Sequence, residues 1–169
     1  AGLTRVHEGW ESGADDILAA VKKGARRAVH AAASRLLREA GIELNAYVIL
    51  GLGGQDRTRE HARATAALVN EAPPTVLRLR TLVPKVNTEL LADVLAGRFR
   101  MLGPHQVLEE TQALLEGITV PVQVESDHYT NYLNVTGRLP EDRERLLDLL
   151  GRARRRPESD FRPFFIGTE

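Results

Sequence analysis

Residues 42–54, with the sequence IELNAYVILGLGG, carry the clearest fold signal in this chain of 169 residues. Apolar side chains alternate along one face of a predicted strand, at positions 42, 44, 46, 48 and 50, and Tyr47 and Ile49 make the second face apolar as well. Burial on both faces is typical of a central strand in a parallel sheet. The strand ends in the turn GLGG, and we expect a helix over 58–70.

The segments on either side repeat this order of strand and helix. Strands are predicted at 1–8, 76–82 and 120–124, with a loop through Gly9 and Gly13 after the first of them. Pro121 makes the last of these strands an expected edge strand. Helices are predicted from Asp15 onward, over 29–40, over 88–96 and from Pro104. In the helix over 29–40 we expect the apolar stripe to face the core; it consists of Val29, Ala32, Ala33, Leu36, Leu37 and Ala40.

Alternating strands and helices predict an α/β protein with a parallel sheet, because each crossover between parallel strands needs such a helix. Four strands make about half of a (β/α) barrel, or a small open sheet. We expect the partial barrel in residues 1–139. Residues 140–169 would form a C-terminal helix and an aromatic tail packed on the barrel.

Composition limits the function. The chain has no cysteine, which excludes a disulfide and a metal or cluster ligated by thiolates of this chain. Its 23 basic and 23 acidic residues balance, so no global field favours nucleic acid or a membrane surface. The apolar runs are too short to span a bilayer, and we expect a cytoplasmic protein that binds a small molecule.

Candidate site residues follow the predicted strands, where ligands bind in α/β folds. Glu11 and Ser12 follow the first strand, and Gly51 and Gly53 the second. The glycine turn could bring backbone N–H groups to a ligand or be a bare tight turn. Arg78 and Arg80 share a strand face that is either wet or binds a carboxylate or phosphate. After the last strand come the catalytic candidates Asp127 and His128, with Asn131; the alternative there is a turn that satisfies its own backbone.

The motifs in order resemble a known superfamily. Residues 6–13 (VHEGWESG) resemble the "GxESG" segment at the fourth barrel strand of radical S-adenosylmethionine (radical SAM) enzymes, and residues 48–54 (VILGLGG) their fifth-strand "hhhGLPGE" segment. Residues 82–90 (LVPKVNTEL) are similar to the segment after the sixth strand. Residues 126–133 (SDHYTNYL) resemble the "SDHxSNYL" ending of one bacterial subgroup.

The resemblance implies the C-terminal half of a partial barrel that binds S-adenosylmethionine. Glu11 and Ser12 would approach the amino-acid or ribose part of the cofactor, and the stretch from Ile49 to Gly53 would pack on its adenine. The family also uses a [4Fe–4S] cluster held by a CxxxCxxC motif, which this sequence lacks. The resemblance therefore implies a fragment that is not catalytically competent alone.

Two other hypotheses remain from the residues. The first is a non-catalytic half-barrel binding module, whose open sheet edge would favour a homodimer. The second is an unrelated small α/β enzyme that uses Asp127 and His128, with an anion held by Arg78 or Arg80.

Overall fold

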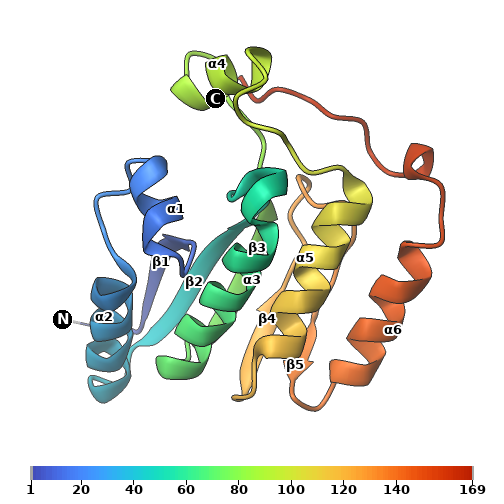
Figure 1. Ribbon diagram of the computed structural model, residues 1–169. Helices are drawn as coiled ribbons and strands as arrows, with labels where there is room; N and C mark the ends of the chain where they lie inside the picture. Colours follow the sequence, from blue (N-terminus) through green and yellow to red (C-terminus); the bar gives the residue numbers. More distant parts are fainter. Residues whose placement is uncertain (1, 169) are drawn as a thin grey trace.

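The computed structural model describes residues 2–168, and its centre is a five-stranded sheet in the order β1-β2-β3-β4-β5 (Figure 1). The four strands β1 (Arg5–Glu11), β2 (Glu43–Leu50), β3 (Val76–Thr81) and β4 (Val122–Glu125) run parallel. The short β5 (Gly137–Leu139) pairs antiparallel with β4. This mostly parallel sheet with alternating helices confirms the predicted α/β class and is consistent with a partial barrel.

Helices cover one face of the sheet. Figure 1 shows α2 (Arg27–Glu39), α3 (Gly54–Glu71), α5 (Pro104–Gly117) and α6 (Arg143–Ala153) as a row in front of the strands. The shorter α1 (Asp15–Ala20) and α4 (Glu89–Leu95) lie at the carboxyl ends of the strands, and the 3₁₀ turn η1 (Glu158–Asp160) lies in the tail. No helix of residues 2–168 covers the opposite face, which we call the open face. Within the described residues, none of the helices is long and apolar enough to span a bilayer.

The alternation along β2 separates the two faces. Leu44, Val48 and Leu50 are buried in the core between sheet and helices. Tyr47 and Ile49 point to the open face and are only half-buried. The prediction of a central parallel strand is therefore right, but the second face of β2 is less covered than its apolar sequence suggests.

The first strand ends later than predicted. β1 continues through Gly9, Trp10 and Glu11, which the glycines had suggested were a loop. Trp10 is fully buried in the core, and its indole N–H donates to the Glu8 carboxylate at 3.3 Å. Burial of the tryptophan extends the strand past Gly9. Ala1, where the predicted strand began, lies outside the described residues.

Helix α2 packs with a different face from the one predicted. Its buried residues are His30, Ala31 and Ser34, whereas Val29 is 57% and Leu36 is 65% exposed. The small Ala31 and Ser34 let the helix approach closely, and the Ser34 hydroxyl donates to the Ala72 carbonyl at 3.0 Å. His30 Nδ1 lies 2.6 Å from the Glu8 carboxylate. The exposed apolar stripe lies on the helix that flanks β1, whose outer edge is unpaired in the described chain.

The prediction of an edge position for the strand near Val122 is wrong. β4 starts at Val122, directly after Pro121, and its outer side pairs with β5, where Gln123 faces Arg138. The proline lacks an N–H donor but lies outside the ladder, so it does not prevent pairing. Beyond α6, the tail returns over the body: Phe161 is buried and Gly167 forms a bridge with Lys85.

Candidate functional site

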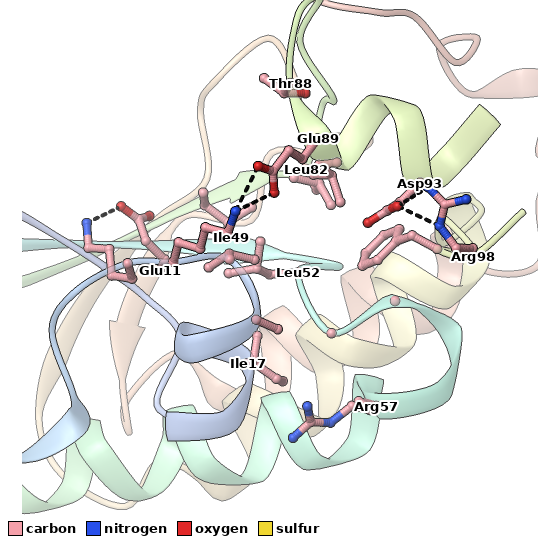
Figure 2. A pocket seen from close by; sticks show the side chains of 18 of the residues that line it. Glu11, Ile17, Ile49, Leu52, Arg57, Leu82, Thr88, Glu89, Asp93 and Arg98 are labelled. Carbon is pink, nitrogen blue, oxygen red and sulfur yellow. Dashed lines mark hydrogen bonds and ion pairs between the residues drawn. The ribbon is translucent and has the colours of Figure 1, made fainter. Parts of the chain in front are cut away.

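A pocket of about 770 Å³ lies at the carboxyl ends of β1, β2 and β3, between α1 and α4 (Figure 2). We call it the strand-end pocket. This is the position where α/β folds bind ligands, because loops and helix starts from several strands converge there. Its apolar wall is formed by Ile17, Val21, Ile49, Leu52, Leu82, Leu90 and Phe99.

Charged side chains surround that apolar wall. Lys23 Nζ lies 2.9 Å from Glu11 Oε1, and both side chains are about a quarter exposed. Lys22 Nζ lies 2.6 Å from a carboxylate oxygen of Glu89 on α4, so this pair connects α1 with α4 across the pocket (Figure 2). Both partners of the Lys22–Glu89 pair are mostly exposed, and such a pair adds little stability. The pocket therefore has an apolar wall with ammonium and carboxylate groups at its rim.

The glycine turn after β2 forms part of the pocket wall. Gly53 and Gly54 line it, and Gly54 adopts a left-handed backbone with φ 62°. A side chain at Gly53 would place its Cβ 2.9 Å from the Arg57 carbonyl oxygen. Glycine is therefore required at both positions, and the backbone here can approach a ligand closely.

Three of the five residues predicted to bind the cofactor line the pocket: Glu11, Ile49 and Gly53. The other two are buried and are not among its lining residues. The Ser12 hydroxyl accepts the backbone N–H of Ala14 at 3.0 Å, so it is engaged in the turn before α1. Gly51 has φ 83°, and its N–H donates to Glu110 at 2.7 Å.

The residues predicted to bind substrate are not among the residues that line the pocket, and they lie on and beside the open face. Sheet register places Tyr47 beside Arg78 and Arg78 beside Glu125, one row away from the pair of Ile49 and Arg80. Because Ile49 lines the pocket, Arg80 is adjacent to the pocket wall.

Arg78 and Arg80 differ in their partners. The Arg78 guanidinium lies 3.0 Å from Asp127 and 3.2 Å from Glu125. Partial burial acts to lower the pKa of Arg78, but the hydrogen bond with Asp127 and the charge of Glu125 outweigh it and raise this pKa. The same hydrogen bond lowers the pKa of Asp127. Arg80 is exposed, stacks at 4.7 Å on the Tyr47 ring and forms no ion pair within residues 2–168.

The segment after β4 is mostly occupied with its own turn. His128 Nδ1 accepts the Thr130 backbone N–H at 3.3 Å, so the ring proton of the neutral form is on Nε2. Burial lowers the pKa of His128, and the nearby charge of Arg80 lowers it further. The Asn131 side chain accepts the Thr81 N–H at 2.7 Å and donates to the Leu79 carbonyl at 2.9 Å. Asp127 pairs with Arg78 and not with His128, so the predicted acid–base pair has no mutual hydrogen bond in the part of the chain described.

The fit to the two implied cofactors differs. S-adenosylmethionine has an adenine with flat aromatic faces and a zwitterionic amino acid, and the strand-end pocket combines an apolar wall with charges of both signs. A [4Fe–4S] cluster needs thiolate ligands, and the sequence contains no cysteine. Among residues 2–168 there is also no group of three His, Asp or Glu side chains placed to hold a metal ion.

Sequence reasoning missed part of the site. Lys22, Lys23, Leu90 and Phe99 come from α1, α4 and the segments that flank them, whose position over the strand ends has no local sequence signal. It also missed Glu110, a fully buried carboxylate on α5. Its signal was available: Glu110 lies on the same helix face as the apolar Val107 and Leu114, where a charge is unusual.

Comparison with known proteins supports the fold. No protein-family model and no curated protein matches the chain. Among solved structures, the chain is similar to the archaeal Methanocaldococcus infernus Elp3 with an N-terminal deletion (1–46), with a TM-score of 0.65 and 18% sequence identity. The match covers 95% of this chain and 37% of that chain, so this chain spans well under half of the Elp3 length. At this identity the likeness shows a shared fold.

Proposed function

We propose that this chain supplies the C-terminal part of an S-adenosylmethionine pocket, as a partial barrel of the radical SAM type. The single observation that carries the proposal is the strand-end pocket, which brings Glu11, Ile49 and Gly53 together. Glu11 comes from residues 6–13, and Ile49 and Gly53 come from residues 48–54, the first two of the segments that resemble the radical SAM superfamily. Elp3, to which the fold is similar, is itself a radical SAM-family protein.

In this proposal the pocket wall divides between the parts of the cofactor. The apolar side chains of Ile49, Leu52 and Leu82 pack on the adenine, since base–apolar contacts bury surface without needing charge. Lys22 and Lys23 attract the carboxylate of the amino-acid part, and Glu11 attracts its ammonium or the ribose hydroxyls. Binding would replace the present Lys23–Glu11 pair by contacts with the ligand.

The chain would not be catalytic alone. In the radical SAM superfamily the [4Fe–4S] cluster supplies the electron that cleaves S-adenosylmethionine. This chain offers no thiolate to hold that cluster, so its own residues would bind and orient the cofactor.

On the substrate side we propose that Arg80 binds an anionic group. Arg78 already has two carboxylate partners, Glu125 and Asp127, whereas among residues 2–168 Arg80 contacts the Tyr47 ring and no carboxylate. An unpaired guanidinium beside the pocket wall suits a carboxylate or phosphate of a substrate. Asp127, His128 and Asn131 would shape the surface next to it.

A homodimer is the second candidate, and exposed apolar residues beside an unpaired edge favour it. Within the described part of the chain no strand pairs with the outer edge of β1, and Leu3, Val29 and Leu36 are each more than half exposed. An edge strand flanked by apolar side chains favours association with another chain. In this alternative the half-barrel is a non-catalytic binding module.

Calorimetry with S-adenosylmethionine tests the proposed pocket. We expect the wild-type chain to bind it, and we expect Ile49→Trp to abolish measurable binding, because the larger ring fills a half-buried position on the pocket wall. Leu36→Trp, at an exposed position far from the pocket, is the matched control and should bind like the wild type. No heat with millimolar S-adenosylmethionine would refute the proposal, and equal binding by the Ile49 variant would move the site elsewhere.

A further inference from the structure

A buried carboxylate lies directly behind the strand-end pocket. Glu110 on α5 has a side chain with no exposed surface, and three groups lie within hydrogen-bond distance of its carboxylate. Its Oε1 accepts the Gly51 N–H at 2.7 Å and lies 2.9 Å from His61 Nδ1. Its Oε2 accepts the Thr58 hydroxyl. Burying a carboxylate is costly unless it is paired and hydrogen-bonded, and here it is both.

His61 continues this network to the neighbouring strand. The ring is 1% exposed, and its Nε2 lies 3.3 Å from the Glu11 carbonyl oxygen. Both ring nitrogens therefore face acceptors, namely the Glu110 carboxylate and the Glu11 carbonyl. The ring therefore lies between a carboxylate on α5 and a backbone carbonyl at the end of β1.

Both residues whose backbone groups contact this network have an unusual backbone conformation. Glu11 has φ 60° and Gly51 has φ 83°, the left-handed region. Side-chain-bearing residues such as Glu11 disfavour this region and keep it only where surrounding contacts impose it. Glu11 ends β1 and lines the pocket, and Gly51 begins the turn whose next residues line it.

We propose that Glu110 and His61 are positioning residues that hold the ends of β1 and β2 in the geometry that forms the strand-end pocket. The inference rests on the proposed function for the identity of the ligand. The positioning of the two strand ends does not depend on it. A well-packed apolar pair would stabilise the core as well as this buried polar pair does, so the polar pair is better explained by the two backbone groups that it contacts.

Hydrogen exchange of the Gly51 amide tests the positioning role of Glu110 and His61 without any ligand. In the wild type we expect this amide to be protected, with a scalar coupling across the hydrogen bond to the Glu110 carboxyl carbon. In the double variant Glu110→Leu/His61→Leu, which removes both buried polar side chains together, we expect Gly51 to exchange roughly tenfold to a hundredfold faster, as for loss of a hydrogen bond to a carboxylate. The Val48 amide in the middle of β2 should stay protected and report that the variant is folded.

The matched control is Glu109→Leu, the preceding residue, whose half-exposed carboxylate pairs with Arg154 at 2.5 Å. It should change neither exchange nor binding. The second measurement is the S-adenosylmethionine dissociation constant, which we expect to rise about tenfold or more in the double variant, since a displaced turn loses oriented contacts. Rescue by Glu110→Gln, which keeps an acceptor for Gly51, should be partial.

The outcomes separate the two proposals. Unchanged Gly51 exchange in the folded double variant would overturn the positioning role of Glu110 and His61. If the double variant fails to fold, the absence of the scalar coupling in the wild type would overturn it. Faster Gly51 exchange with unchanged S-adenosylmethionine affinity would show that the positioning of the strand ends does not affect ligand binding in the pocket, and would overturn that part of the proposal. A wild type with a protected Gly51 amide that binds no S-adenosylmethionine would refute the proposed ligand but not the positioning role of Glu110 and His61.

Discussion

Gly13 is where a single methyl group should disturb the fold and the pocket together. It lies between β1 and α1, and its N–H donates to Thr65 Oγ1 on α3 at 3.0 Å. A Cβ at this position would lie 2.2 Å from the Ala64 carbonyl oxygen and 2.6 Å from Thr65 Cα. The backbone of Gly13 is not in the left-handed region, so the close approach of α1 to α3, and not a torsion angle, requires glycine.

The expected cost of Gly13→Ala follows from these contacts. Cβ atoms essentially never approach closer than 3.0 Å, so α1 and α3 must separate by roughly 1 Å. Overpacking of this kind costs about 1–3 kcal/mol, and the weakened hydrogen bond to Thr65 adds about 1 kcal/mol. We therefore expect a loss of about 3 kcal/mol in the free energy of unfolding. Since α1 carries Ile17 of the pocket wall, S-adenosylmethionine affinity should fall as well.

The matched control is the same substitution at Gly151. This glycine lies inside α6, and a Cβ added there would meet no other atom within 4 Å. Alanine at this position should raise stability by up to about 1 kcal/mol, because it loses less backbone freedom on folding. Urea unfolding followed by the fluorescence of the single, fully buried Trp10 measures both variants. A change of less than about 0.5 kcal/mol for Gly13→Ala would refute the reasoning.

Two further predictions concern the open face and α2. The pKa of His128 should lie below the ordinary histidine value of about 6.5 by NMR titration, so its titration costs the protein stability as pH falls below that value and has no effect above it. Arg80→Ala, or inorganic phosphate bound at Arg80, should raise this pKa, and no rise with either would contradict the role given to Arg80. On α2, Val29→Lys should change the free energy of unfolding by less than about 0.5 kcal/mol, whereas Ala31→Lys should unfold the chain. If analytical ultracentrifugation shows a dimer that Val29→Lys dissociates, the homodimer is supported; a monomer at all concentrations would contradict it.

The order of elements could be predicted because each strand and helix has its own local signal. The run over β2 and its glycine turn indicated the strand–helix step, and Pro104 marks the first residue of α5 as expected. The orientation of α2 could not be predicted in the same way. Periodicity identifies an apolar stripe through Val29 and Leu36, but not the small Ala31 and Ser34 that fit against the sheet.

The residues of the site likewise divide into those that the sequence could predict and those that depend on tertiary contacts. Glu11 and Gly53 could be located because they were expected after strands, and strand ends converge at one edge of a parallel sheet. Ile49 was located only through the resemblance of residues 48–54 to a known family. Leu90 and Phe99 could not, because the placement of α4 over that edge depends on tertiary contacts and not on local pattern. The bacterial subgroup suggested by the ending after β4 stays a prediction, as does the cytoplasmic location.

The central claim is that the strand-end pocket binds S-adenosylmethionine, and a methyl NMR titration tests it most directly. On addition of S-adenosylmethionine we predict shifts in the methyl resonances of Ile17, Ile49 and Leu52, which line the pocket. The resonances of Leu146 and Leu150, buried on α6, should stay in place. Shifts confined to α6, or no shifts at millimolar ligand, would contradict the claim.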